Sequence, residues 1–190
     1  MKREASKYDG VMIMLHWVIG IGIILLAGTE LFRHEFPKGH FIREGLKFIH
    51  QPAGTVLFAL ILVRLAWRMT LAKVPSALHP AGFGELSAKI VHSALYGLMV
   101  AIPLLGLLYV FGSDKTIDFG AFQLVLPLKS SIGTMAKSMR DLHETLGVGI
   151  LLMALVHALA ALGHHYVLKD GLLSRMQFRH PRSLVIEAAE

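Results

Sequence analysis

The sequence predicts an all-α membrane protein, a single domain built as a bundle of four transmembrane helices with both termini in the cytoplasm. Its 190 residues are 54% hydrophobic and only 17% charged. The mean hydropathy of +0.58 is higher than ordinary soluble domains reach. Four apolar stretches are each long enough to cross the roughly 30 Å of hydrocarbon in a bilayer. These observations indicate a small multi-pass membrane protein.

The first predicted span covers 11–29, VMIMLHWVIGIGIILLAGT, a run without Asp, Glu, Lys or Arg. A cleaved signal peptide is the rival interpretation, because a basic lead precedes the run. The length of the run, the lack of a clear small-x-small site and the His16–Trp17 pair favour a span. The second predicted span covers 48–68. It carries His50 in its first turn, together with Pro52, which is tolerated where helical amides lack partners anyway.

The third predicted span covers 86–111, with His92 near its start. Pro103 lies inside it, which a membrane helix tolerates when neighbouring helices satisfy the freed carbonyl. The connection 112–140 is the longest, and we expect its apolar portion FGAFQLVLPL to lie on the membrane surface. The fourth predicted span covers 142–168, and residues 170–190 form a predicted cytoplasmic tail.

Positive charge is unequal on the two sides of this topology. Eleven Lys and Arg residues fall on the side of the termini and eight on the other. This excess predicts that both termini lie in the cytoplasm. The basic residues flank the apolar segments and do not form one run, so the net charge of +6 does not indicate nucleic-acid binding.

Histidines occur at matched depths in the predicted spans. His143 and His157 are fourteen residues apart, which places them about 21 Å apart along a helix and only about 40° apart around it. In the predicted topology His50 lies at the depth of His143, and His16 at the depth of His157. Two imidazoles from facing helices are a common way to hold a haem iron.

The absence of cysteine excludes thiolate-ligated iron–sulfur clusters and covalent c-type haem attachment. A single histidine in a span is as often an interhelical hydrogen-bonding residue as a ligand. Four histidines in two depth-matched pairs, without comparable Asp or Glu in the spans, predict two stacked cofactor sites.

Two arginines fit the same arrangement. Arg64 is fourteen residues after His50, so it shares the face of His50 but lies near the depth of the inner pair. Arg68 is one turn deeper. A guanidinium suits the carboxylate of a haem propionate, although both arginines could also end the helix by extending to the membrane interface.

The chain resembles the bacterial cytochrome b561 family of di-haem membrane cytochromes. The matching segments cover most of the chain in the expected order: LHW at 15–17, IHQPAG at 49–54, LVRLAWR at 62–68, HSALY at 92–96, LHETLG at 142–147 and VHALAALGHHYVLKDGLL at 156–173.

The resemblance implies a four-helix bundle with two b-type haems and with His16, His50, His143 and His157 as axial ligands. It also implies electron transfer across the bacterial inner membrane, linked to the quinone pool. One activity in this family is the oxidation of superoxide at the periplasmic face with reduction of ubiquinone, so an oxidoreductase of this type is expected.

The site of the quinone and the partner proteins stay open at this stage. The quinone candidates are His92, His164 and Arg64 at the inner end and Lys137 and Arg140 at the outer end, and the sequence favours neither. A membrane-anchor subunit that passes electrons from a soluble dehydrogenase or hydrogenase is the alternative function. A metal or proton transporter is a third interpretation, disfavoured by the lack of intramembrane carboxylates.

Overall fold

The computed structural model describes residues 7–72, 75 and 83–178. In this part of the chain, four helices are long and apolar enough to cross a membrane, which confirms the predicted all-α class with four spans. The cytoplasmic position of both termini stays a prediction. They are α1 (Gly10–Arg33), α2 (Phe41–Thr70), α3 (Phe83–Gly112) and α5 (Ala136–Gly163). Helices α1, α2 and α3 extend beyond their predicted spans at both ends, because polar residues at the ends of an apolar stretch continue the helix outside the hydrocarbon. Helix α5 begins before its predicted span but ends at Gly163, and residues 164–168 of that span form a π-helical turn.

The largest extension is at the start of α2, which begins at Phe41 and not at Phe48. The side chain of His40 accepts a hydrogen bond from the amide of Ile42 and caps the helix. His50 and Pro52 therefore lie inside α2 and not in its first turn, which corrects the sequence-based interpretation. A proline at this position removes one intrahelical hydrogen bond.

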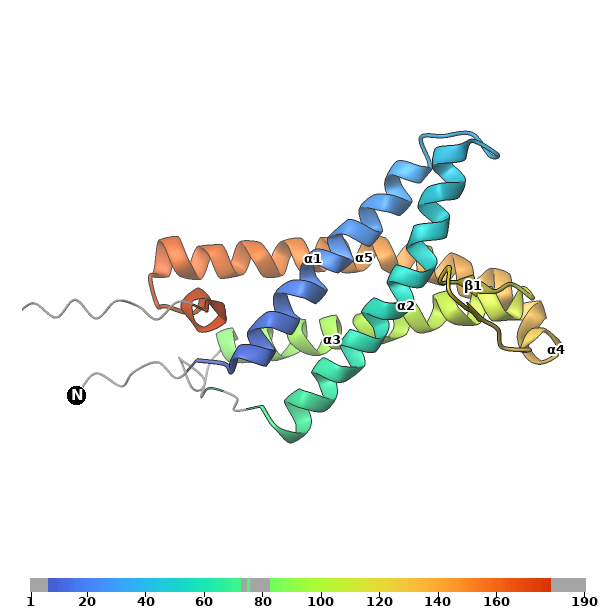
Figure 1. Ribbon diagram of the computed structural model, residues 1–190. Coiled ribbons are helices and arrows are strands. Elements are labelled where there is room, and N and C mark those ends of the chain that lie inside the picture. The colour runs from blue at the N-terminus through green and yellow to red at the C-terminus, as the bar shows by residue number, and fades with distance from the viewer. Residues whose placement is uncertain (1–6, 73–74, 76–82, 179–190) are drawn as a thin grey trace, which may run out of the picture.

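The helices pack as two antiparallel pairs. Helix α1 lies along α2, and α3 lies along α5, and the two pairs cross obliquely (Figure 1). Further contacts join α2 to α3 and α1 to α5. A core cluster of Leu15, Ile19 and Ile61 fixes α1 against α2, with Met99 and Val100 of α3 packed on it. The bundle therefore brings residues of α1, α2, α3 and α5 within reach of one another.

The long connection between α3 and α5 has structure of its own. Strand β1 (Ile117–Asp118) pairs antiparallel with β2 (Gln123–Leu124), and α4 (Lys129–Ile132) and a 3-10 turn, η1 (Gly133–Met135), follow. Ile117 is buried against Val110 and Phe111 at the end of α3. The apolar portion thus forms a hairpin on the bundle, and its position at a membrane surface stays a prediction.

The two terminal segments meet at one end of the bundle. Helix α5 continues as a π-helical turn, η2 (His164–Leu168), and a 3-10 turn, η3 (Leu173–Met176), follows. The indole of Trp17 in α1 donates to the carbonyl oxygen of Met176 at 2.9 Å. We call this end of the bundle the terminal end. The opposite end holds the α1–α2 loop and the hairpin, and we call it the loop end. Residues 179–190 of the predicted tail lie outside the described residues.

Candidate functional site

The structure brings the four span histidines together in two pairs. The ring centres of His50 and His143 are 6.1 Å apart, and we call these residues the loop-end pair. The ring centres of His16 and His157 are 6.3 Å apart, and these residues are the terminal-end pair. Helix α5 contributes one histidine to each pair, and α2 and α1 contribute the others.

The spacing within each pair fits a metal ion held between two imidazoles. A histidine nitrogen binds a first-row metal ion at about 2.0–2.1 Å, so two rings on opposite sides of one ion have centres roughly 6 Å apart. Both pairs meet this requirement. In the described part of the chain, no group of three or more His, Cys, Asp or Glu side chains could hold a metal ion.

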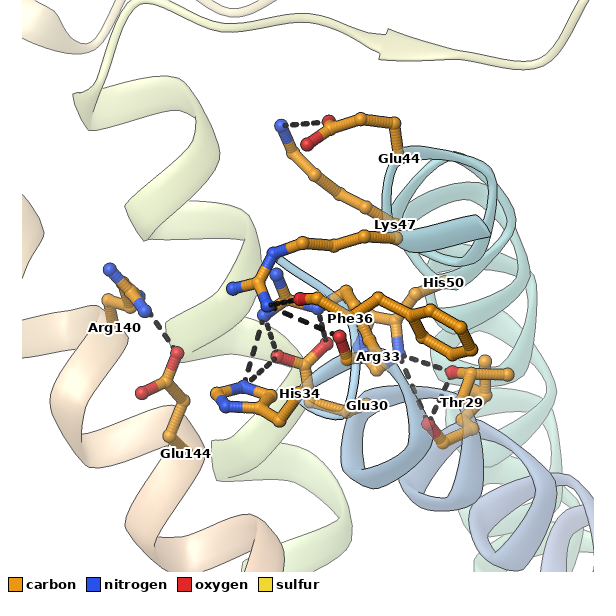
Figure 2. A network of polar contacts seen from close by, with 12 residues as sticks. Thr29, Glu30, Arg33, His34, Phe36, Glu44, Lys47, His50, Arg140 and Glu144 are labelled. Atoms are coloured by element: carbon orange, nitrogen blue, oxygen red, sulfur yellow. Dashed lines mark hydrogen bonds and ion pairs between the residues drawn. The ribbon is translucent and has the colours of Figure 1, made fainter. Parts of the chain in front are cut away.

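Backbone carbonyls orient both rings of the loop-end pair. Nδ1 of His143 donates to the carbonyl oxygen of Ile102 at 2.7 Å, and Nδ1 of His50 donates to that of Leu26 at 3.2 Å. The Thr29 hydroxyl lies 3.2 Å from the same His50 nitrogen (Figure 2). Since a carbonyl oxygen only accepts, each Nδ1 carries the proton, and each Nε2 keeps its lone pair for a metal.

The position of the His143 ring depends on a glycine in α3. A Cβ atom added at Gly106 would lie 2.9 Å from Cε1 and 3.0 Å from Nδ1 of His143. Carbon atoms do not approach this closely, so a side chain here would displace the ring. Gly106 therefore lets the ring lie against the backbone of α3, where the carbonyl of Ile102 holds it.

Two cavities of about 300 Å³ each adjoin the loop-end pair. Both are lined by Glu30, His50, Gly54, Pro103, His143 and Glu144. In the first, which we call the apolar cavity, aliphatic side chains of all four long helices make up most of the remaining wall. The second, which we call the polar cavity, is also lined by six cationic side chains, namely Arg33, Lys38, Arg43, Lys47, Lys115 and Arg140.

This division suits a haem, whose macrocycle is apolar and whose two propionates are anionic. The apolar cavity can receive the macrocycle, and the cations of the polar cavity can receive carboxylates. The chemistry of the lining residues therefore fits the cofactor that the sequence predicts.

Two carboxylates beside the loop-end pair were not singled out by the sequence. Glu30 forms an ion pair with Arg33 and lies 3.4 Å from Nε2 of His34 (Figure 2). Glu144 accepts from Nε of Arg140 at 2.8 Å. The expectation of spans without comparable acidic residues is therefore wrong. Glu144 lies within the predicted fourth span itself, and α1 extends past its predicted boundary and includes Glu30. Each carboxylate is neutralised by an arginine of its own helix.

A buried cation marks the terminal-end pair. Arg64 is only 7% exposed, and it interacts electrostatically with both His16 and His157. Its Nη1 donates to the Tyr96 hydroxyl at 3.1 Å, and its guanidinium lies 5.4 Å from the centre of that ring. Arg68 lies over the same ring at 5.6 Å.

No carboxylate is paired with Arg64 in the described residues, and its Nε has no hydrogen-bond partner there. A buried guanidinium with an unused donor is costly unless an anion meets it. A haem propionate at this end would supply that anion.

The quinone candidates separate into the two ends. His92 of α3 lies 5.3 Å from the ring of His157, so three imidazoles meet near Arg64. Nδ1 of His164 lies 2.5 Å from a carboxylate oxygen of Asp170. Arg140 lines the polar cavity at the loop end, whereas Lys137 is exposed and lines neither cavity.

Comparison with known proteins places these features in a family. The model of the prokaryotic cytochrome b561 family matches residues 7–179. Cytochrome b561 homolog 1 of Escherichia coli is 29% identical over 92% of this chain and 98% of that protein. A probable superoxide oxidase, CybB of Yersinia pestis, is 29% identical over 90% of this chain and 96% of that protein. Cytochrome b562 of Cereibacter sphaeroides is 28% identical over 91% of this chain and 96% of that protein.

Proposed function

The chain belongs to the prokaryotic cytochrome b561 family, and we propose that it is a di-haem oxidoreductase that carries single electrons between a donor at one membrane face and ubiquinone. Membership makes it a multi-pass bacterial membrane cytochrome that binds haem b and transfers electrons. The number of haems, the quinone, the donor and the inner membrane as its location belong to the proposal.

The observation that carries the proposal is the presence of two histidine pairs with the same ring spacing. His50 and His143 would hold one haem, and His16 and His157 the other. Haem b, when bound, supplies reversible one-electron redox chemistry. The protein orients the ligands through Leu26 and Ile102 at the loop end, and Arg64 and Arg68 would bind propionates at the terminal end.

The loop end is suited to a small anionic donor. Six cations and three carboxylates line the polar cavity, and this net positive charge would attract an anion such as superoxide toward the loop-end pair. Superoxide is a one-electron donor, which matches a one-electron cofactor. In the proposed orientation both termini are cytoplasmic, so the loop end faces the periplasm.

An anchor subunit for a soluble redox partner is the second candidate. The side chains of Phe122, Val125 and Leu126 in the hairpin region are 46–59% exposed, and such a surface could bind a protein donor at the loop end. The protein would then pass electrons without reacting with superoxide.

Assays on the purified protein distinguish these functions. We expect two haems per chain, and reduction of ubiquinone when superoxide is generated and no partner protein is added. Superoxide dismutase in the same assay should abolish the reduction. Two haems without superoxide-dependent quinone reduction would favour the anchor function, and a preparation that is fully helical but binds no haem would contradict both.

A further inference from the structure

We infer that Trp17 is a positioning residue that orients the ring of His16 for haem binding, and that the turns after α5 hold Trp17 in place. This inference rests on the proposed function, in which His16 and His157 hold one haem. It gives a role to residues 164–176, which we call the C-terminal strap.

The terminal-end pair lacks the contacts that orient the loop-end pair. Both rings of the loop-end pair donate to backbone carbonyls. Within the described residues, no hydrogen bond reaches the ring nitrogens of His16 or His157. The ring of His16 instead lies 5.5 Å from the ring of Trp17, with the two planes inclined by 74°. This edge-to-face arrangement is a favoured geometry of aromatic pairs, so the orientation of His16 depends on where Trp17 lies.

The C-terminal strap holds Trp17. The side chain of Trp17 is 43% exposed, so packing alone does not fix its indole. Its Nε1 donates to the carbonyl oxygen of Met176, the last residue of η3, at 2.9 Å. The carbonyl oxygen of Arg175 accepts from the amide of Tyr8 at 3.4 Å. Two hydrogen bonds therefore join the strap to the chain at the start of α1 (Figure 1).

The strap has a defined backbone conformation. Lys169 and Gly171 have positive φ angles of 52° and 77°, and these left-handed residues reverse the chain between η2 and η3. Asp170 stabilises the reversal. One of its carboxylate oxygens lies 2.5 Å from Nδ1 of His164, and the other accepts from the amide of Leu172 at 3.0 Å. The strap thus presents the carbonyl that binds Trp17 at a fixed position.

The orientation of the His16 ring matters because an imidazole binds a metal ion along the direction of its nitrogen lone pair. A neighbour that orients such a ring typically contributes about 10- to 100-fold to metal affinity. At the loop end this neighbour is a backbone carbonyl of an adjacent helix. At the terminal end the indole of Trp17, anchored by the strap, would do the same for His16.

Electron paramagnetic resonance of the purified ferric protein tests the role of Trp17. The low-field line of a haem with two imidazole ligands depends on the angle between the imidazole planes, which is 71° for His16 and His157. Trp17→Phe keeps an aromatic ring but removes the donor to Met176. We expect it to shift the line that is absent from His16→Ala, to weaken haem binding at that end about tenfold and to leave the other line unchanged. An unmoved line, or equal shifts of both lines, would overturn the inference.

Trp67→Phe is the matched control at the same end of the bundle. Trp67 also donates through its indole, to a carboxylate oxygen of Asp9 at 3.2 Å, but in the described part of the chain it makes no ring contact with a paired histidine. This variant should move neither line. A shift equal to that of Trp17→Phe would mean that any loss of an indole donor disturbs the terminal end, and would refute the specific role of Trp17.

Gly171→Ala tests the strap without altering Trp17. A Cβ at Gly171 would meet only Ser174 Oγ, at 3.6 Å, so the substitution acts through the left-handed backbone, which disfavours a side chain. We expect the same line to shift, with a smaller loss of haem affinity. Gly120→Ala, at a φ of 81° in the hairpin, imposes the same strain at the loop end and should leave that line in place.

The outcomes separate the inference from the proposed function. An unmoved line in Gly171→Ala would refute the role of the strap, and this variant also decides the matter if Trp17→Phe does not fold. Two haems per chain with no response of the terminal-end line would contradict only the inference. Fewer than two haems in the unsubstituted protein would contradict the proposed function, and the inference with it.

Discussion

The loop-end and terminal-end pairs have nearly the same ring spacing, 6.1 and 6.3 Å, but different surroundings. Carbonyl oxygens and a glycine hold the rings of the loop-end pair, and arginine–carboxylate pairs flank it. A third imidazole and a buried arginine lie beside the terminal-end pair. The comparison teaches that two sites with the same pair of imidazoles can differ in the hydrogen bonds and charges around them, and we expect these neighbours to set how firmly each proposed haem is held.

Replacement of one of the four paired histidines should have the largest effect on haem content. It should remove the haem of one pair and leave that of the other. His50→Ala and His143→Ala should each lose the loop-end haem and keep the terminal-end one, and His16→Ala and His157→Ala should do the reverse. Haem quantified per chain should fall from two to one. His165→Ala, outside both pairs, should retain two. Loss of the same haem in His16→Ala and His143→Ala would show that the pairing is wrong.

Gly106→Ala should weaken the loop-end site alone. The added Cβ would lie 2.9 Å from the His143 ring, so the ring must move away from the Ile102 carbonyl. Loss of an orienting contact of this kind typically costs about 10- to 100-fold in metal affinity, which haem titration of the apoprotein would measure. Gly97→Ala is the matched control, because a Cβ at Gly97 of the same helix meets nothing within 4 Å. Equal losses in both variants would indicate a general effect of glycine substitution in α3.

Tyr96→Phe should act on the terminal end by a smaller amount. It keeps the aromatic ring under Arg64 and removes the hydroxyl that accepts from Nη1. A hydrogen bond to a charged group contributes about 1.5–3 kcal/mol, so the midpoint of thermal unfolding should fall and the terminal-end haem should be lost first. Tyr166→Phe, at an exposed residue, is the control. An unchanged melting midpoint would mean that the hydroxyl does not stabilise Arg64.

Thr29→Val should have the smallest effect, on the loop end. It removes a hydroxyl 3.2 Å from Nδ1 of His50, while the Leu26 carbonyl stays as an acceptor. We expect haem affinity at this end to fall only a few-fold, in line with about 1 kcal/mol for a neutral hydrogen bond. Thr70→Val, which removes a hydroxyl bonded to the carbonyl of its own helix, should change nothing. A complete loss of the loop-end haem would show that Thr29, and not Leu26, orients the ring.

Much of the fold could be predicted from the sequence, because helices in a membrane satisfy their own backbone and need a long apolar run. Length and hydropathy therefore identified four spans. The helix boundaries were less predictable. The start of α2 could not be predicted from hydropathy, because the first part of this helix, before its apolar stretch, carries charged residues at 43, 44 and 47.

The pairing of the histidines could also be predicted from the sequence, because the helical rise per residue converts a separation in sequence into a difference in depth along the bundle. Fourteen residues between His143 and His157 were enough to predict two levels on one helix. What surrounds each level was not predictable. Glu30 and Gly106 reach the site from α1 and α3 at places that depend on how helices cross, and no local pattern marks them.

By itself, the sequence of this protein determined that the chain crosses a membrane four times and carries imidazoles at two depths. Only the tertiary structure decided that the Ile102 carbonyl meets His143, that Arg64 is buried against Tyr96 and that two acidic groups lie beside the loop-end pair. The reason is physical. Hydropathy and helical rise act along one chain segment, whereas a carbonyl acceptor, a close glycine or a buried charge acts between segments and depends on the angle and register at which helices pack.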